Sequence, residues 1–193
     1  MLRYEEALQR VLQNSVAPSS QSLPLDETLH LFLSEDLYAS RAQPPWDNSA
    51  MDGYAIAHSD LDSTTTFQII EEIAAGARPQ NPIVTGTCAR IFTGAPMPVG
   101  ADTVIIQENT ERENSIMTIL QKPRLGANVR KKGEEYTQGS LIATKGSCVT
   151  IGLLGLAAAL GCATLPVYRR PRIAILSTGD ELVPLGSQPD LHP

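Results

Sequence analysis

The sequence predicts a multidomain α+β protein in which an all-β, barrel-like unit is inserted into a domain that contains helices. Hydrophobic residues at helical spacing occur near the N-terminus and again around residues 151–160. From about residue 54 to residue 139, short apolar runs alternate with Gly, Pro and Asn turns, a spacing typical of a small all-β unit. A continuous apolar run at 173–176 is of the kind found in buried parallel sheets.

We therefore expect three parts. Residues 1–44 and 143–168 form one discontinuous domain, and residues 45–142 form the inserted β domain. Residues 169–193 begin an α/β domain.

The first part is expected to contain two helices and a short strand. An amphipathic helix over residues 3–14 is indicated by hydrophobic residues at helical spacing, namely Tyr4, Ala7, Leu8, Val11 and Leu12. Asp26 is a plausible N-cap for a second helix that continues to Leu33. Residues 37–40 then form a strand that leads into a polar loop.

The inserted domain is expected to be built from short strands. The chain re-enters a strand at 54–56, and further strands are expected at 67–70, 88–92, 103–107, 115–120 and 140–143. No helical period of any length interrupts them.

The most apolar run of the chain, Ile151–Val167, is predicted to be a buried helix followed by a strand. Thr150 is the expected cap, Gly161 ends the helix, and the strand covers 163–167. The run is shorter than the roughly 20 residues needed to span a bilayer, so no membrane segment is expected.

The apolar run Ile173–Leu176 is expected to be a parallel strand, with the polar loop Ser177–Glu181 at its C-terminal end. Residues 182–193 cannot supply the crossover helix and neighbouring strands that such a strand requires. We expect the chain to be a fragment, the alternative being a last strand that depends on another sheet.

Composition limits the functional classes. The 193 residues are 42% hydrophobic and 19% charged, values typical of a soluble globular protein. The net charge of -6 argues against a nucleic-acid surface, which needs a basic face. The three cysteines form no Cys-x-x-Cys pair, and the N-terminus lacks an apolar signal-peptide core. We expect buried free thiols and a cytoplasmic protein.

The stretch Pro44–Ile56 is the main candidate site. It contains the single tryptophan, Trp46, and the two carboxylates of Asp47 and Asp52 around small and polar residues. Read by itself, it is either a tight turn held by its own side chains or a loop that lets a ligand or cation approach the backbone.

Three further stretches carry suitable chemistry, each with a plainer alternative. Thr93 and Gly94 could hold an anion through hydroxyl and backbone amides, or could form an ordinary turn. Three cations would suit phosphate, and the adjacent carboxylates of Glu134 and Glu135 would suit Mg²⁺, or the whole segment could be a solvated hairpin. The Ser177–Glu181 loop could bind phosphate and a divalent ion, or be a Gly-Asp turn.

Taken together, these motifs resemble those of the molybdopterin molybdotransferases, which include MoeA-type proteins and the E domain of gephyrin. The resemblance rests on Asp-Asn-Ser-Ala-Met-Asp-Gly-Tyr-Ala at 47–55, Arg-Ile-Phe-Thr-Gly-Ala-Pro-Met-Pro at 90–98, and Val-Arg-x-x-Gly-Glu at 129–134. Ser-Thr-Gly-Asp-Glu-Leu follows at 177–182, in the order that this family shows.

The resemblance implies a fold and an activity. Residues 1–44 and 143–168 would be an elongated scaffold and dimerisation domain, and residues 169–193 the start of a MogA-like three-layer α/β domain. Such enzymes insert molybdate into adenylylated molybdopterin and release AMP with the help of Mg²⁺. A homodimer and a MogA-type molybdopterin adenylyltransferase partner are also implied.

The resemblance also assigns site residues. Asp52, Thr93 and Glu181 match the family's active-site positions. The substrate-binding residues would be Ser49, Gly94, Ser177, Thr178, Gly179 and Asp180, and the metal would be held by Glu134, Glu135 and Asp180. Asp47 and Asn48 are expected to hold the shape of the loop.

The sequence departs from the family where Glu135 stands at a position that is often Asp, which keeps the charge and makes the side chain one methylene longer. Two other functional hypotheses compete with the leading one. The chain as it stands could be a non-catalytic dimerising scaffold, or a generic Mg²⁺-dependent phosphohydrolase built on its acidic loops.

Overall fold

The structure is a computed structural model that describes residues 2–16, 18–179 and 182–187. These residues form a mostly β fold with few helices. The helical elements are α1 (Tyr4–Asn14), α2 (Ile151–Ala159) and the 3-10 turns η1 (Leu25–Glu27), η2 (His58–Asp62) and η3 (Gln107–Asn109). The strands are β1 (Ser20–Pro24), β2 (Leu37–Tyr38), β3 (Asn48–Ser49), β4 (Gly53–Ile56), β5 (Thr66–Ile73), β6 (Thr87–Ile91), β7 (Thr103–Ile106), β8 (Thr110–Glu113), β9 (Ile116–Ile119), β10 (Val129–Arg130), β11 (Leu141–Ala143) and β12 (Thr164–Tyr168).

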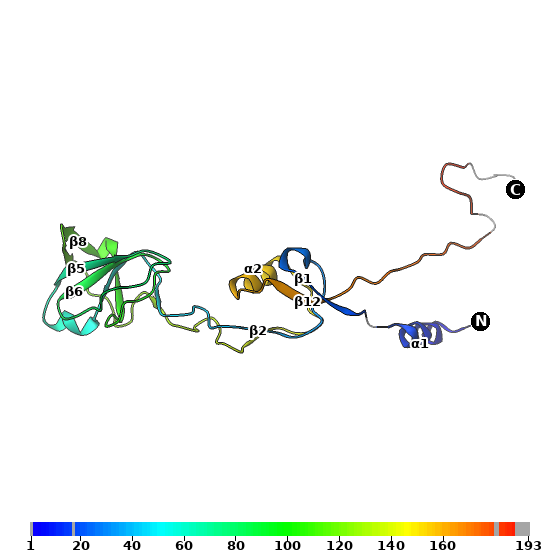
Figure 1. The fold of residues 1–193 in the computed structure, drawn as a ribbon, viewed down its shortest axis with the longest axis horizontal. Helices are drawn as coiled ribbons and strands as arrows, with labels where there is room; N and C mark the ends of the chain where they lie inside the picture. Colours follow the sequence, from blue (N-terminus) through cyan, green and yellow to red (C-terminus); the bar gives the residue numbers. More distant parts are fainter. Residues whose placement is uncertain (1, 17, 180–181, 188–193) are drawn as a thin grey trace.

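A curled six-stranded sheet forms the larger packed unit, residues 46–130, which we call the β unit (Figure 1). Its strand order is β7-β4-β6-β5-β9-β8, and only the β5 and β6 pair is parallel. All four residues of β4 are buried because hydrophobic clusters cover both of its faces. Tyr54 and Ile56 join one cluster and Ala55 the other, as the alternation of a strand requires.

The smaller packed unit, residues 20–34 and 147–168, is called the α2 unit here. β1 pairs with β12 in antiparallel register, and α2 packs beside them. The Thr150 hydroxyl accepts a hydrogen bond from the N–H of Leu153 at 3.2 Å, and Gly161 follows the helix with a φ of 82°. The predicted cap, helix and strand are therefore confirmed, but the prediction that the helix is buried is wrong. Within α2 only Ala157 is buried, because only one side of the helix packs against the small core.

Two extended passes of the chain connect the units, and β2 pairs with β11 between them (Figure 1). The first pass also contacts the C-terminal end of α2. The Ser40 hydroxyl donates to the Leu160 carbonyl at 2.8 Å, and the Arg41 guanidinium donates to the Ala159 carbonyl. These donors satisfy carbonyls that the helix itself leaves unpaired.

The helix expected from Asp26 to Leu33 is wrong. Only the short turn η1 forms there, and Phe32 and Leu33 then make isolated bridges to Cys148 and Val167. The reason is that every second side chain is buried in this segment. Leu31 and Leu33 are buried, whereas Phe32 between them is 52% exposed. This alternation suits extended chain and not a helix.

The parallel strand expected at 173–176 is also wrong, because these residues lie in extended chain without a partner strand and their side chains are exposed. A parallel strand needs neighbours in the same sheet, and the described residues place none beside it.

The other expected elements are present. The helix at 3–14 appears as α1, which has no buried residue, and the strands expected in the β unit and at 37–40 and 140–143 appear with altered bounds. Strands β1, β3, β8 and β10 were not expected. β8, with the sequence Thr-Glu-Arg-Glu, is a mostly exposed edge strand, so it carries no hydrophobic alternation. No helix in the described ranges is long and apolar enough to cross a bilayer.

The contact between β4 and β7 requires glycine at position 53. A Cβ atom there would lie 1.9 Å from the carbonyl oxygen of Ile105. We expect Gly53→Ala to lower the free energy of unfolding by about 1–3 kcal/mol, the usual range for overpacking. Urea titration followed by circular dichroism measures it.

Gly152→Ala is the matched control, because the nearest atom to a Cβ at that position is 3.8 Å away. We expect it to change the free energy of unfolding by less than about 1 kcal/mol. Equal losses in the two variants would contradict the contact argument.

Candidate active site

The loop from Trp46 to Asp52 is held against the loop that follows β6. The N–H of Met97 donates to the carbonyl of Asp47 at 2.9 Å, and the N–H of Ser49 donates to the carbonyl of Ala95 at 3.0 Å. The N–H of Gly94 donates back to the carbonyl of Ser49 at 2.8 Å. Segments 47–49 and 94–97 thus form a short antiparallel ladder, which we call the loop ladder.

Gly94 adopts a φ of 83°, a conformation that L side chains rarely take, so a glycine is favoured at this turn. Ser49 is buried, and its hydroxyl donates to the carbonyl of Met51 at 2.5 Å. Ser49 and Gly94, which the family resemblance assigned to substrate binding, therefore shape the loops. The N–H groups of Thr93 and Gly94, considered as anion donors from the sequence, donate within the protein instead.

At the far end of the loop ladder, Asp52 and Thr93 are in direct contact. Oδ1 of Asp52 accepts hydrogen bonds from both the backbone N–H and the hydroxyl of Thr93, each at 2.8 Å. The bond from the backbone N–H lowers the pKa of Asp52 most, and the bond from the hydroxyl comes next. With the positive charge of Arg90, they hold this pKa below its ordinary value of 3.8. Asp52 is therefore an ionised carboxylate whose other oxygen accepts no hydrogen bond from the described residues.

A buried cation, Arg90, lies beneath this pair. Its guanidinium donates to the carbonyl of Gly53 at 2.9 Å and to Oε1 of Gln107 at 2.7 Å. The rings of Tyr54 and Phe92 have their centroids 5.2 Å and 4.7 Å from the guanidinium carbon. These contacts offset the cost of burying a charge.

Arg90 was not among the residues predicted for the site. A signal was present in the sequence, because an arginine inside the apolar strand 88–92 must be paired if the strand is buried.

Asp47 connects the loop to the segment 129–136. Its carboxylate accepts a hydrogen bond from Nζ of Lys131 at 2.9 Å and another from the N–H of Lys132 at 2.8 Å. These bonds lower the pKa of Asp47, with the Lys131 side chain contributing most. Asp47 thus has the shape-holding role expected for it, and Asn48 lies in β3 opposite Arg130.

The predicted metal ligands Glu134 and Glu135 lie just after these lysines. Glu134 accepts a hydrogen bond from the N–H of Lys131 at 2.8 Å, whereas the carboxylate of Glu135 has no hydrogen bond within the described ranges. No group of three or more His, Cys, Asp or Glu side chains among residues 2–16, 18–179 and 182–187 could hold a metal ion. The third predicted ligand, Asp180, lies outside the described residues.

The predicted site residues near the C-terminus are not brought to the loops. Ser177, Thr178 and Gly179 are exposed, and no hydrogen bond connects them to Asp52 or Thr93. Asp180 and Glu181 lie outside the described residues. The structure thus brings together Asp52, Thr93, Ser49 and Gly94, and it places Glu134 and Glu135 in the separate segment that contacts Asp47.

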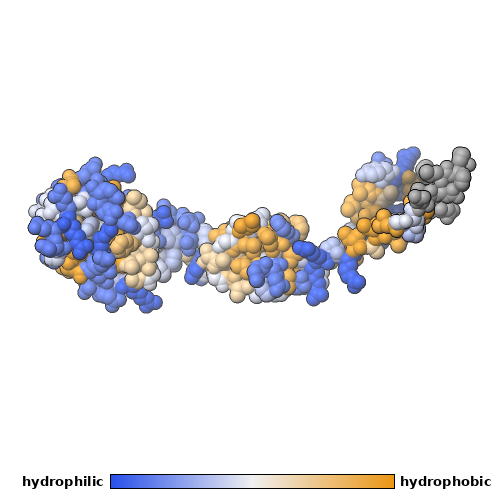
Figure 2. All heavy atoms as spheres, turned by 90° about the horizontal axis from the view of Figure 1, so that it is seen from above, coloured by the Kyte–Doolittle hydropathy of each residue, from blue (hydrophilic) through white to orange (hydrophobic). Residues whose placement is uncertain are grey.

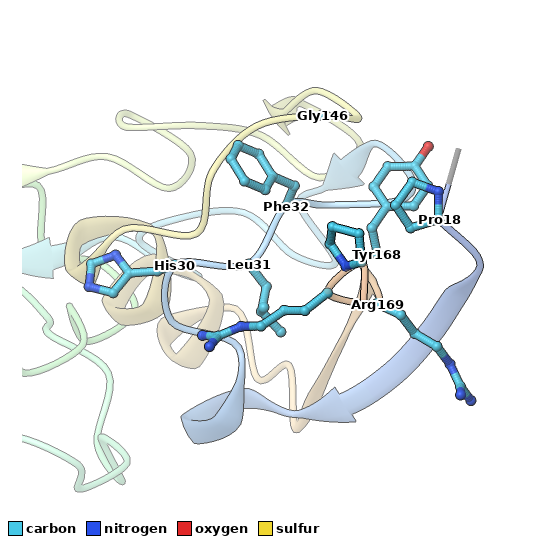
Figure 3. Close-up of a pocket in the computed structure, with 9 residues that line it drawn as sticks. Pro18, His30, Leu31, Phe32, Gly146, Tyr168 and Arg169 are labelled. Carbon is cyan, nitrogen blue, oxygen red and sulfur yellow. The ribbon is translucent and has the colours of Figure 1, made fainter. Parts of the chain in front are cut away.

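A pocket lies between the α2 unit and the chain segments that flank it. Figure 3 shows this pocket of about 370 Å³, with Phe32 and Tyr168 among the nine residues that line it. Arg169 and Arg170 are its cations, and no carboxylate lines it. It shares no residue with the loops that hold Asp52.

Comparisons of the sequence with known proteins agree with one another. A sequence model described as the MoeA N-terminal region (domain I and II) matches residues 2–161. The chain is 44% identical over 147 residues to a molybdopterin molybdenumtransferase of Nostoc sp., covering 74% of the chain and 34% of that relative. It is 35% identical over 188 residues to one from Bacillus subtilis, covering 93% of the chain and 44% of that relative.

The solved structures give the same result. Two crystal structures of molybdopterin biosynthesis MoeA proteins from Pyrococcus horikoshii match with TM-scores of 0.85 and 0.80 and sequence identities of 32% and 30%. The matches cover 99% and 89% of this chain and 50% and 47% of those chains. The chain spans less than half of the length of the curated relatives named above.

The contact between Asp52 and Thr93 generates a test by titration. Thr93→Val removes the hydroxyl donor and keeps the backbone N–H, so we expect the pKa of Asp52 to rise towards 3.8. Because the pKa is lowered in the folded protein, the stabilisation from this contact is present above pH 3.8 and is lost as the pH falls through the folded pKa. Carboxyl ¹³C NMR titration measures the shift.

Thr144→Val serves as the control, since that hydroxyl contacts only Ser147, well away from the loops. The pKa of Asp52 should not move in this variant. A pKa that is the same in Thr93→Val as in the unaltered chain would show that the hydroxyl contact contributes nothing.

Proposed function

The chain belongs to the molybdopterin molybdenumtransferase (MoeA) family, and on that basis we propose that it acts in molybdenum cofactor biosynthesis, at the insertion of molybdate into adenylylated molybdopterin with release of AMP. The observation that carries the proposal is the fixed, ionised carboxylate of Asp52. Asp52 and Thr93 also match the active-site positions that the family resemblance assigns.

The charges around the loops suit an anionic substrate. Adenylylated molybdopterin contains a pyrophosphate, and the release of AMP breaks it. Arg90 lies close enough to Asp52 to lower the pKa of that carboxyl, while Lys131 and Lys132 lie on the neighbouring segment, where Lys131 is paired with Asp47. Positioned cations of this kind stabilise negative charge that develops on a leaving phosphate.

The carboxylate oxygens of the described residues are donors of the kind that bind a divalent ion. Mg²⁺ binds through one or two carboxylates together with substrate phosphates, so it does not need a cluster of three protein ligands. Among the described residues, no group donates a hydrogen bond to the second carboxylate oxygen of Asp52 or to the carboxylate of Glu135. When bound, Mg²⁺ neutralises phosphate charge.

Within this proposal the chain's own groups have distinct tasks. The hydroxyl and N–H of Thr93 fix the orientation of the Asp52 carboxylate, leaving its second oxygen for the substrate or its ion. We also assign Ser49 and Gly94 to the shape of the substrate-facing loop, and Ser177–Glu181 to the substrate's pterin end, as the family resemblance implies.

We further propose a homodimer formed through the α2 unit, and a MogA-type molybdopterin adenylyltransferase as the supplier of substrate. Hydrophobic residues gather on the unit in the middle of Figure 2. A shallow apolar face there is lined by residues of η1 and α2, with Ile151 76% exposed. A contiguous apolar face of this kind marks a site of association.

A second candidate function is a non-catalytic dimerising scaffold. It is favoured by the same apolar face.

Measuring AMP release separates the two. The chain, and a version extended to the length of its relatives, are mixed with adenylylated molybdopterin, Mg²⁺ and molybdate. Release by the extended version supports the transferase, and release by neither supports the scaffold.

In the version that releases AMP, we expect Asp52→Asn to lower the rate by roughly 100-fold, the scale on which losing one stabilising group slows an enzyme. The amide keeps the size of the side chain and removes its charge. The rate of AMP release under saturating substrate measures the effect.

Asp62→Asn is the control, because Asp62 is an exposed aspartate of η2 away from the loops. Its rate should match that of the unaltered protein. A rate in Asp52→Asn that equals the control would remove Asp52 from the site.

The dimer proposal predicts that Ala158→Glu, which places a charge on the exposed face of α2, shifts the chain from dimer to monomer in sedimentation velocity. Val84→Glu, an equally drastic change at an exposed residue of the β unit, should leave the dimer intact. A dimer that survives Ala158→Glu would place the interface elsewhere.

A further inference from the structure

A groove beside the candidate site has features of a ligand-binding surface. It has a volume of about 600 Å³ and is lined by Trp46, Gly76, Ala77, Arg78, Pro79 and Pro96. Trp46 is 50% exposed, although a large aromatic side chain usually buries most of its surface. The volume lies within the range of small-molecule sites.

The wall that carries Arg78 is held in place by a charged contact. The carboxylate of Glu71 on β5 accepts hydrogen bonds from the N–H groups of Gln80 at 2.9 and 3.1 Å and Asn81 at 2.9 Å. The side chain of Gln80 in turn donates to the carbonyl of Arg78 at 2.8 Å. Bonds to a charged acceptor are stronger than neutral ones, so this exposed loop has a fixed shape.

The opposite wall is fixed by the loop ladder. Trp46 immediately precedes Asp47, whose carbonyl accepts from Met97 and whose carboxylate is held by Lys131 and Lys132. Pro96 of the same wall lies opposite Asn48 in an isolated bridge. Both walls are therefore set before any ligand binds, which lowers the entropic cost of binding.

The two side chains that could bind a ligand form no ion pair or cation-π contact with the described residues. Arg78 forms no ion pair within the described part of the chain, where the two ion pairs are Arg10 with Glu6 and Lys131 with Asp47. Its guanidinium is not stacked on Trp46, since the cation-π contacts found there involve Arg90 and Lys145. An open indole and an unpaired guanidinium thus line the same groove.

The groove is also close to the candidate site. Pro96 is three residues from Thr93, so even a fully extended chain separates their Cα atoms by at most about 11 Å. A molecule with a ring on Trp46 and a phosphate near Arg78 could therefore reach the Asp52 and Thr93 pair with its other end.

We propose that this groove binds a fused-ring heterocycle carrying a phosphate, with the ring stacked on Trp46 and the phosphate paired with Arg78. This deepens the proposed function, on which it rests, because both halves of adenylylated molybdopterin have this chemistry. Stacking on an indole and pairing with a guanidinium are favourable for such a ligand.

The single tryptophan of the chain makes a direct test possible, because intrinsic fluorescence reports on Trp46 alone. The chain is titrated with AMP, adenosine and inorganic phosphate, and we expect AMP to quench the emission saturably. Neopterin monophosphate, whose ring is itself fluorescent, is titrated by calorimetry. Binding of AMP or of neopterin monophosphate assigns the groove to the adenylate half or the pterin half.

The matched variants are Arg78→Gln and Arg124→Gln. Arg124 is an exposed arginine of the same unit that does not line the groove. We expect Arg78→Gln to weaken binding of the phosphate-bearing ligand by about fivefold or more, and Arg124→Gln to leave it unchanged. Trp46→Ala should abolish binding in calorimetry, while Trp46→Phe, which keeps an aromatic face, should retain part of it.

The proposal is overturned if neither ring compound binds, if inorganic phosphate binds as tightly as the ring compound that does bind, or if the two arginine variants weaken binding equally. These outcomes leave the AMP-release assay with Asp52→Asn untouched, so failure of the groove is distinguishable from failure of the transferase function.

Discussion

The antiparallel loop ladder between 47–49 and 94–97 is the constraint on which the candidate site depends. It brings Asp52 to Thr93, which is 41 residues away in the sequence, and sets the wall of the groove at Trp46. Each backbone hydrogen bond contributes only about 1 kcal/mol net, so no single bond holds the loop. The ladder persists because its ends are also fixed by charged contacts at Asp47 and Asp52.

These contacts also decide how charge is distributed over the site. Two aspartates on one loop would repel an anionic substrate if nothing offset them. Asp47 is paired with Lys131, and Arg90 lies beneath Asp52 with its hydrogen bonds satisfied by Gly53 and Gln107. The result is an ionised Asp52 carboxylate in a neighbourhood whose cations match its charge, which a purely acidic loop could not provide.

Around the smaller core, the sequence predicted the ends of α2 but wrongly predicted a helix at 26–33. Thr150 and Gly161 bound α2 as expected, because a cap and a C-terminal glycine act locally. The helix predicted from Asp26 is wrong because a good N-cap residue is not enough to form a helix. At Leu31–Leu33, every second side chain is buried, which suits an extended chain. The partners of Arg90 and Asp47 are set by tertiary contacts between segments far apart in the sequence, and no local pattern encodes them.

The exposure of the Asp52 and Thr93 pair limits what the β unit can do alone. Thr93 is exposed and Asp52 only partly buried, so water competes with every electrostatic contact they make. Stabilising charge on a departing phosphate is effective in a dry site, where the same dipoles act in a low dielectric. For the proposed reaction, a surface from outside the β unit therefore has to cover this pair.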